Sequence, residues 1–216
     1  MRGVDDVLTP TDRTTLRRLK ERGRYEREVV NGVLDAGQIC HVGVVVRGTP
    51  TVLPMAYGRI DDVLYLHGAV GNALLRASVG VDVCVTVTLL DGLVLARSAF
   101  HHSMNYRCAV VFGTAERVVD PGEQRRAAAA IVDHVVVGRS DVARPPTDEE
   151  LRATAILRLP IDEASAKVRT GGPVDDDEDL DLPVWAGVVP IGLAVGAPEQ
   201  DPGQRIADLP PPVLRG

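Results

Sequence analysis

The stretch that most constrains the fold is Val81–Leu90, in which valine occupies every second position from Val81 to Val87. A period of two places these valines on one face of a β-strand, so this strand needs an apolar partner layer on that side. Asp91-Gly92 follows directly and predicts a hairpin turn, with Leu93–Ser98 as the partner strand. The chain is therefore expected to build an antiparallel sheet with one buried face.

Other segments rich in β-branched residues extend this sheet. A meander of three strands is expected before Val81, and three more strands after Ser98. With six or seven of these eight segments as antiparallel strands, together with a few helices, the expected fold is mainly β, of α+β type, as a small barrel. The additional strands are expected at Ile39–Arg47, Thr51–Ile60, Val63–His67, Arg107–Val118, Ala155–Leu159 and Trp185–Val195.

Helical periodicity and capping residues predict five helical segments between and before these strands. They are Thr11 or Asp12 to about Glu21, Tyr25–Ala36, Gly71–Val79, Pro121–Val137 and Asp148–Arg152. Residues 1–10 are expected to form a loose arm, and the tail, rich in proline and glycine, to be flexible. The predicted division is an arm and helix over 1–24, one barrel domain over 25–195, and a flexible tail over 196–216.

Composition excludes several classes of protein. Only seven residues are aromatic, so the core must be aliphatic, and the formal charge of −6 argues against a nucleic-acid partner. Three cysteines without a CxxC pair indicate reduced thiols and no zinc–thiolate site. Neither a leader nor an apolar run long enough to span a membrane is present, so a cytoplasmic protein without a membrane partner is expected. The acidic run Asp175–Asp179 is expected to be a solvated loop, with calcium binding as the alternative, and no metal site is predicted.

Two polar clusters interrupt the aliphatic sequence. In Val63–Arg76 a short strand leads into His67-Gly68, a glycine turn and the start of a helix. This order aims backbone N–H groups and an imidazole at one point, which suits a phosphorylated cofactor. The second cluster is Arg97–Arg107. Dinucleotide-binding and P-loop motifs are absent, and a Ser98–His101 nucleophile–base pair is an alternative of low specificity.

Four stretches carry a resemblance to a known family: Thr51–Tyr57, Leu64–Gly68, Ser98–Arg107, and Lys167–Gly172 followed by Leu182–Gly187. In this order they resemble the pyridoxamine 5′-phosphate oxidase-like flavin-binding split barrels. The likeness is nearer to the flavin-nucleotide-binding branch that includes the nitroimidazole-resistance proteins. The resemblance implies a six-stranded antiparallel Greek-key split β-barrel with flanking helices, a homodimer, and FMN in two clefts between the subunits.

The family pattern also assigns residues to the site. His67 is the implied catalytic residue, and its alternative is a histidine at a strand end. Trp185 would cover one face of the flavin or anchor the core or a dimer interface. The chain departs from the pattern at Asn72-Ala73, where the oxidases carry a basic pair, so Arg97 or Arg107 would have to compensate. The implied cofactor-binding residues are Pro54, Met55, Ala56, Tyr57, His67, Gly68, Ala69, Asn72, Arg97, Ser98, Ser103, Asn105, Tyr106, Arg107 and Trp185.

The resulting hypothesis is an FMN-dependent oxidoreductase that acts on a small organic substrate. The alternatives are a non-catalytic flavin carrier, a haem-binding protein with His67 as axial ligand, and a dimer without a cofactor. A phosphorylated substrate is disfavoured, because Lys167 and Arg169 are the only basic clamp near the C-terminus and the acidic run opposes them.

Overall fold

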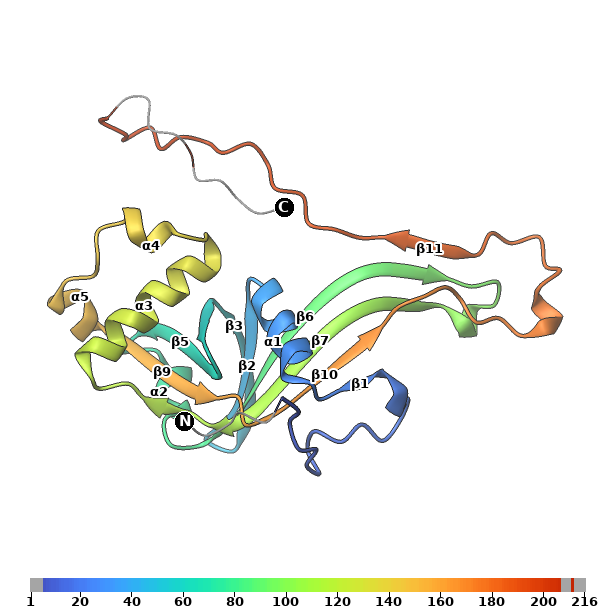
Figure 1. The fold of residues 1–216 in the computed structure, drawn as a ribbon, viewed down its shortest axis with the longest axis horizontal. Helices are drawn as coiled ribbons and strands as arrows, with labels where there is room; N and C mark the ends of the chain where they lie inside the picture. The colour runs from blue at the N-terminus through green and yellow to red at the C-terminus, as the bar shows by residue number, and fades with distance from the viewer. Residues whose placement is uncertain (1–5, 207–210, 212–216) are drawn as a thin grey trace.

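In the computed structural model, which describes residues 6–206 and 211, two antiparallel sheets surround an aliphatic core (Figure 1). The seven-stranded sheet has the order β1-β10-β7-β6-β2-β3, with β11 paired to β6, and the four-stranded sheet has the order β4-β5-β9-β8. The strands are β1 (Gly23–Arg24), β2 (Cys40–Val46), β3 (Thr49–Met55), β4 (Tyr57–Ile60), β5 (Val63–Ala69), β6 (Asp82–Leu95), β7 (Ser103–Thr114), β8 (Glu116–Arg117), β9 (Thr154–Pro160), β10 (Glu163–Arg169) and β11 (Gly187–Pro190).

Helices α3 and α5 contact the four-stranded sheet and α4 packs on α3, whereas α1 contacts the seven-stranded sheet and α2 contacts β2 (Figure 1). Helix α3 lies so close to β4 that a Cβ added at Gly58 would come within 2.7 Å of the α3 backbone at Ala130. No helix of the described residues is long and apolar enough to cross a membrane. The helices are α1 (Arg27–Ala36), α2 (Ala73–Ser78), α3 (Pro121–Val135), α4 (Arg139–Val142) and α5 (Asp148–Ala153), with 3-10 turns η1 (Lys20–Arg22), η2 (Ala99–His101) and η3 (Asp177–Asp179).

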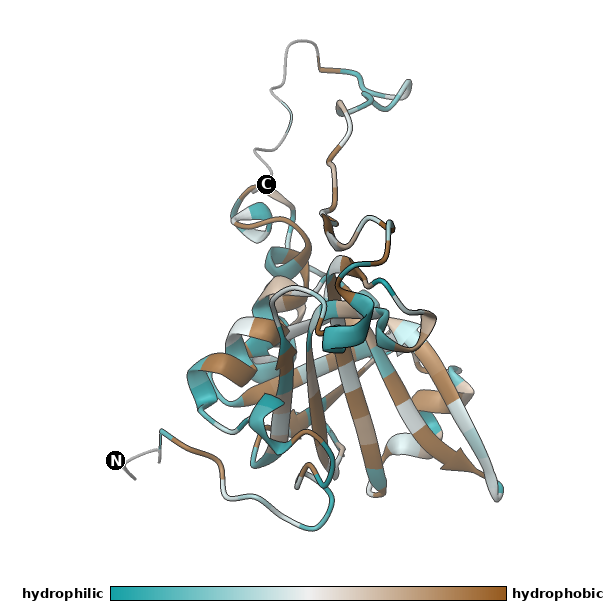
Figure 2. Ribbon diagram, turned by 90° about the vertical axis from the view of Figure 1, so that its right-hand side faces the viewer, coloured by the Kyte–Doolittle hydropathy of each residue, from teal (hydrophilic) through white to brown (hydrophobic). Residues whose placement is uncertain are grey.

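The mainly β, α+β prediction is confirmed, and the alternation that led to it is visible in the packing. Val83, Val85 and Val87 of β6 are all buried, whereas the residues between them are not. Figure 2 shows the same alternation of hydrophobic and hydrophilic residues along neighbouring strands. Valine, leucine and alanine side chains, together with Tyr57, fill the space between the sheets, as the shortage of aromatic residues requires.

The hairpin turn predicted at Asp91-Gly92 is wrong. Strand β6 runs through both residues with a register shift between Leu90 and Gly92, and the chain reverses only after Leu95. Strand β11 passes beside this bulge, and a Cβ added at Gly92 would lie 3.1 Å from the carbonyl oxygen of Val189. Glycine at this position therefore allows a neighbouring strand to approach closely. The turn prediction failed because a bulge and a turn favour the same dipeptide.

Other strand boundaries also differ from the prediction. The expected strand Thr51–Ile60 divides at Ala56 into β3 and β4, which belong to different sheets. Pro54 lies in β3, at the edge of its sheet, where a missing N–H is tolerated. Strand β10 was not predicted, and the expected closing strand Trp185–Val195 is limited to β11.

The predicted helix from Thr11 or Asp12 to Glu21 is also wrong: the structure has a turn and the 3-10 turn η1. The polar side chains of this segment bond to the barrel instead, with Arg13 pairing Asp82 and Glu163. Residues 6–10 are not a loose arm, because Leu8 is buried in the core. The division into arm, barrel domain and tail stays a prediction, and residues 1–5, 207–210 and 212–216 lie outside the described residues.

Candidate functional site

The first site residue, His67, lies in β5 between β4 and β9, opposite Ile156 of β9. Its Nδ1 atom is buried and has no hydrogen-bond partner among the described residues. Burial lowers the pKa of this imidazole below its ordinary value. Burial therefore favours the neutral form of the ring, and its Nδ1 atom is left unpaired among the described residues.

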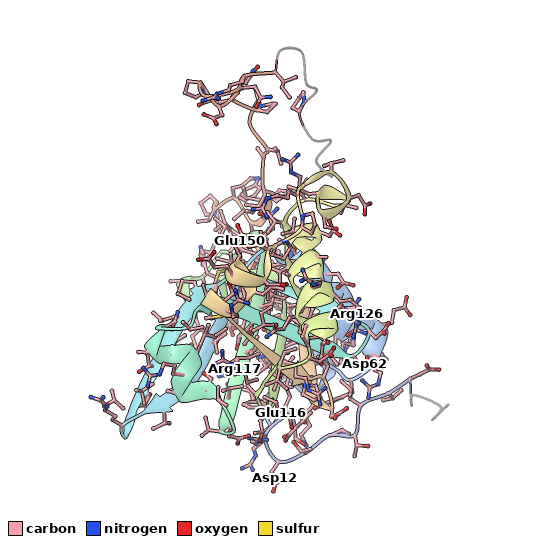
Figure 3. The ribbon with its side chains drawn as sticks, turned by 90° about the vertical axis from the view of Figure 1, so that its left-hand side faces the viewer. Asp12, Asp62, Glu116, Arg117, Arg126 and Glu150 are labelled. Carbon is pink, nitrogen blue, oxygen red and sulfur yellow. The ribbon has the colours of Figure 1, made fainter. Side chains whose placement is uncertain are left out.

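His67 opens into an apolar groove between α3 and α5. A cavity of about 150 Å³ is lined by His67 together with Ile131, Leu151 and Ile156 among others. A larger cavity of about 330 Å³ adjoins it, since Ala128, Val132 and Pro146 line both. Figure 3 shows α5, which carries Glu150, beside the helix that carries Arg126. The groove is apolar apart from its rim, where arginines pair with Asp148 and Glu150.

The residues after His67 support α2. The Asn72 side chain accepts hydrogen bonds from the backbone N–H groups of Leu74 and Leu75, so it caps this helix. A Cβ added at Gly68 would lie 2.7 Å from Leu75, so glycine allows α2 to pack on β5. Ala69 ends β5 and is exposed. Gly68 and Asn72 therefore each have a structural role, and the cap occupies the side-chain Oδ1 atom of Asn72, a residue predicted to bind the cofactor.

The predicted stretch Pro54–Tyr57 crosses from one sheet to the other. Tyr57 is fully buried, and its hydroxyl group contacts the carbonyl oxygens of Leu34 and Gly37, the latter at 2.9 Å. Pro54 is exposed, and Met55 and Ala56 are half-buried. The Tyr57 side chain therefore belongs to the core, and the backbone of this stretch is the part that remains for a ligand.

The second cluster surrounds the connection between β6 and β7. Arg97 donates to Asp175 from its backbone N–H and from its guanidinium, both at 2.8 Å, and the Asp175 side chain is only 1% exposed. Ser98 lies 2.9 Å from the Nδ1 atom of His101. The Nε atom of Arg97 is buried without a partner among the described residues. This ion pair fixes the loop after β10 against the loop after β6.

Two side chains of β7 are likewise paired with charged neighbours. Arg107 makes a two-point contact with Asp91, at 2.9 and 2.7 Å, and the pair lowers the pKa of Asp91. Asn105 is buried, with its Nδ2 atom 3.1 Å from the carbonyl oxygen of Gly171 and its Oδ1 atom accepting from Arg169. Ser103 and Tyr106 are half-buried. The two arginines predicted to compensate for Asn72-Ala73 are thus already neutralised by carboxylates.

The structure does not bring the two clusters together within one chain. The connection between β6 and β7 lies at one end of the molecule, and β5 with α3 lies toward the other (Figure 1). Trp185 precedes β11 beside the long hairpin and is 64% exposed. His101, Asp175 and Asp179 place potential ligand atoms within 4.8 Å of one another, although Arg97 already neutralises Asp175. His67 with its groove is the part of the predicted site that is formed in the single chain.

Sequence reasoning missed the residues that complete these clusters. Asp91 and Asp175 were assigned to a turn and to a solvated loop, but each holds an arginine of the second cluster. Arg169 was considered only as a substrate clamp, yet it is buried and joined to Asn105. The signal for Asp91 and Asp175 was the presence of Arg97 and Arg107, since a half-buried arginine requires an acceptor.

Known proteins share this fold and much of this sequence. The family model of pyridoxamine 5′-phosphate oxidase matches residues 26–168. Among solved structures, the flavocytochrome Anf3 from Azotobacter vinelandii is 41% identical, with 95% of both chains covered and a TM-score of 0.88. The FAD and haem binding protein from Mycobacterium smegmatis is 39% identical, covering 88% of this chain and 94% of that one, with a TM-score of 0.83.

A putative 5-nitroimidazole antibiotic resistance protein from Bacteroides thetaiotaomicron is 26% identical over 66% of this chain and 84% of its own, with a TM-score of 0.55. Among curated proteins, none matches this chain. The family match and the relatives confirm the resemblance seen in the sequence. The chain belongs to the pyridoxamine 5′-phosphate oxidase family.

Proposed function

We propose that this protein binds a flavin and a haem and exchanges electrons with a small organic substrate, and that the imidazole of His67 would hold the haem iron. The observation that carries the haem assignment is a buried imidazole nitrogen, unpaired within residues 6–206 and 211, beside an apolar groove. The two relatives at 41% and 39% identity, one a flavocytochrome and one an FAD and haem binding protein, support both cofactors.

The residues around His67 fit a haem. Leaving a buried polar group unpaired is unfavourable by about 1–3 kcal/mol, so such a group indicates a ligand site. Because burial lowers the His67 pKa, protons compete weakly with a metal for the nitrogen. The groove beside it offers the aliphatic walls of Ile131, Val132 and Leu151 to a flat apolar macrocycle. When bound, a haem supplies one-electron exchange and a flavin supplies hydride exchange.

The flavin would use the cluster at the end of the long hairpin. The buried Nε–H of Arg97 finds no acceptor in the part of the chain that the structure describes, and an oxygen atom of a ligand would satisfy it. The family pattern implies FMN, whereas the M. smegmatis relative is named for FAD. FMN and FAD share the isoalloxazine ring, so titration of the protein with each of them shows which one it binds.

A homodimer would bring the two polar clusters together, because a single chain holds the His67 cluster and the Arg97–Arg107 cluster apart. Exposed apolar side chains on and beside the hairpin favour an interface there. From β11 the chain continues along an extended path away from its own barrel (Figure 1), and Leu193 there is 87% exposed. Sedimentation of the full chain should give twice the monomer mass; a monomer at micromolar concentration would contradict this part. The exposed side chains are Leu90, Leu93, Met104, Trp185 and Val189.

Reconstitution tests the cofactor assignment. The full chain is titrated with haem, FMN and FAD, and each bound chromophore is measured by absorption after gel filtration. We expect wild-type protein to bind haem and a flavin, and His67→Gly to bind the flavin but give a different haem spectrum. Added imidazole should restore the wild-type spectrum to His67→Gly by entering the space that the side chain vacated. Unaltered haem binding in His67→Gly would refute the ligand assignment, and failure of both flavins to bind would refute the flavin assignment.

A further inference from the structure

A separate cavity of about 420 Å³ lies where the segment before α1 meets the loop after β10. One wall contains Glu21, Arg22 and Arg24, and the other contains residues 168–174. Strands β1 and β10 pair directly, with Gly23 opposite Lys167, so backbone hydrogen bonds hold the two walls together. The cavity shares no lining residue with the groove at His67.

Arg169 forms the floor of this cavity and is only 8% exposed. Three of its N–H groups donate to Asn105 Oδ1 and to the carbonyl oxygens of Gly171 and Gly172, the latter two at 3.2 and 3.1 Å. Within the described part of the chain, no carboxylate lies within 4.0 Å of its guanidinium. Carbonyl dipoles orient this charge without neutralising it, and a buried charge without a counter-ion is strongly unfavourable.

Two further arginines concentrate positive charge at the same place. The Nε atom of Arg22 is 4.0 Å from the largely exposed carboxylate of Glu21. Arg24 donates to the carbonyl oxygens of Glu21 and Gly23, at 2.6 and 2.8 Å, and has no carboxylate within 4.0 Å among the described residues. Arg22 also contributes, after burial, to lowering the pKa of Arg169, so the two guanidinium groups are close enough to repel each other.

We propose that this cavity binds the diphosphate group of an organic ligand. Guanidinium groups bind phosphate oxygens through paired N–H donors, and three of them match the charge of a diphosphate better than that of a single carboxylate. The chain as a whole has a formal charge of −6, so this concentration of arginine is local and not part of a basic surface. The cavity volume lies within the range of small-molecule sites, roughly 300–1,000 Å³.

Calorimetric titration of the full chain with inorganic pyrophosphate and with ADP tests the site. We expect one saturable site, with binding about tenfold weaker in Arg22→Gln and in Arg24→Gln, because each removes a charge-assisted contact. Arg17→Gln is the matched control, since Arg17 is exposed, near in sequence and outside the cavity lining. Circular dichroism verifies that each variant is folded. The absence of saturable binding by both probes, or equal weakening in Arg17→Gln, would overturn the proposal.

A second titration distinguishes two sources of the diphosphate, FAD and a separate nucleotide. This titration depends on the proposed flavin binding, whereas the first one does not. If the group is part of FAD, wild-type protein should bind FAD more tightly than FMN, and Arg22→Gln should abolish that difference. If it belongs to a separate nucleotide, FAD and FMN should bind equally and ADP should still bind to the flavin-loaded protein. A chain that binds pyrophosphate but no flavin would refute the proposed function and leave this site standing.

Discussion

Replacing His67 by leucine should stabilise the haem-free protein. The substitution exchanges a half-buried imidazole, whose buried Nδ1 has no partner among the described residues, for an apolar side chain of similar size beside Leu151 and Ile156. An unpaired buried polar group is unfavourable by about 1–3 kcal/mol. Because the ring also borders the cavity, we expect a gain in the free energy of unfolding at the lower end of this range, about 1 kcal/mol. For a chain of this length that corresponds to a rise in Tm of roughly 2–4 °C.

His134→Leu is the matched control for this experiment. The Nε2 atom of His134 is 2.6 Å from the carbonyl oxygen of Gly37, and its ring centroid is 4.3 Å from that of Tyr57. Removing this satisfied histidine should destabilise the protein by about 1 kcal/mol or more. Thermal unfolding of both variants and wild type, followed by circular dichroism without haem, gives the comparison. A fall in Tm for His67→Leu as large as that for His134→Leu would show that the His67 imidazole is structural.

Three other expectations follow from the packing and the pKa shifts. The free energy of unfolding of the haem-free protein should fall as pH decreases below 6.5, the ordinary pKa of histidine, because the unfolded chain protonates His67 before the folded one does. The slope from this group is at most about 1.4 kcal/mol per pH unit. Denaturant titrations at several pH values should show a smaller slope in His67→Leu than in the wild type. Gly58→Ala should cost about 1–3 kcal/mol in the same titration, since its Cβ would strike the α3 backbone, whereas Gly32→Ala, with open space around it, should cost far less. Cys40, whose pKa burial raises to about 12, should resist iodoacetamide until the protein unfolds; fast labelling of native Cys40 would contradict its burial.

The sequence predicted best those features that depend on a short pattern alone. The valine alternation in β6 identified its buried face, because a period of two is sufficient to assign the two faces of a strand. Pro121 and Gly37 marked a helix start and a helix end correctly, since their backbone restrictions are local. The mainly β fold follows from such local signals summed along the chain.

Features that depend on distant contacts could not be predicted in this way. Gly92 is read locally as a turn residue, and only the passage of β11, about a hundred residues later, explains it as a close contact. Arg97 was assigned to the cofactor, because its partner Asp175 is 78 positions away and could not be recognised locally. Asn72 shows a different difficulty, because an amide that caps a helix and one that binds a phosphate have the same sequence context. The two polar clusters lie apart in the single chain, and local sequence patterns carry no signal for the distance between them.

The absorption spectrum of the purified full chain, compared with that of His67→Leu prepared identically, tests the central claim most directly. The account predicts flavin bands together with a haem Soret band in the wild type, and flavin bands without the Soret band in His67→Leu. An unchanged Soret band in His67→Leu would contradict the role assigned to His67. A wild-type protein that stays colourless after incubation with haem and flavins would contradict the proposed function as a whole.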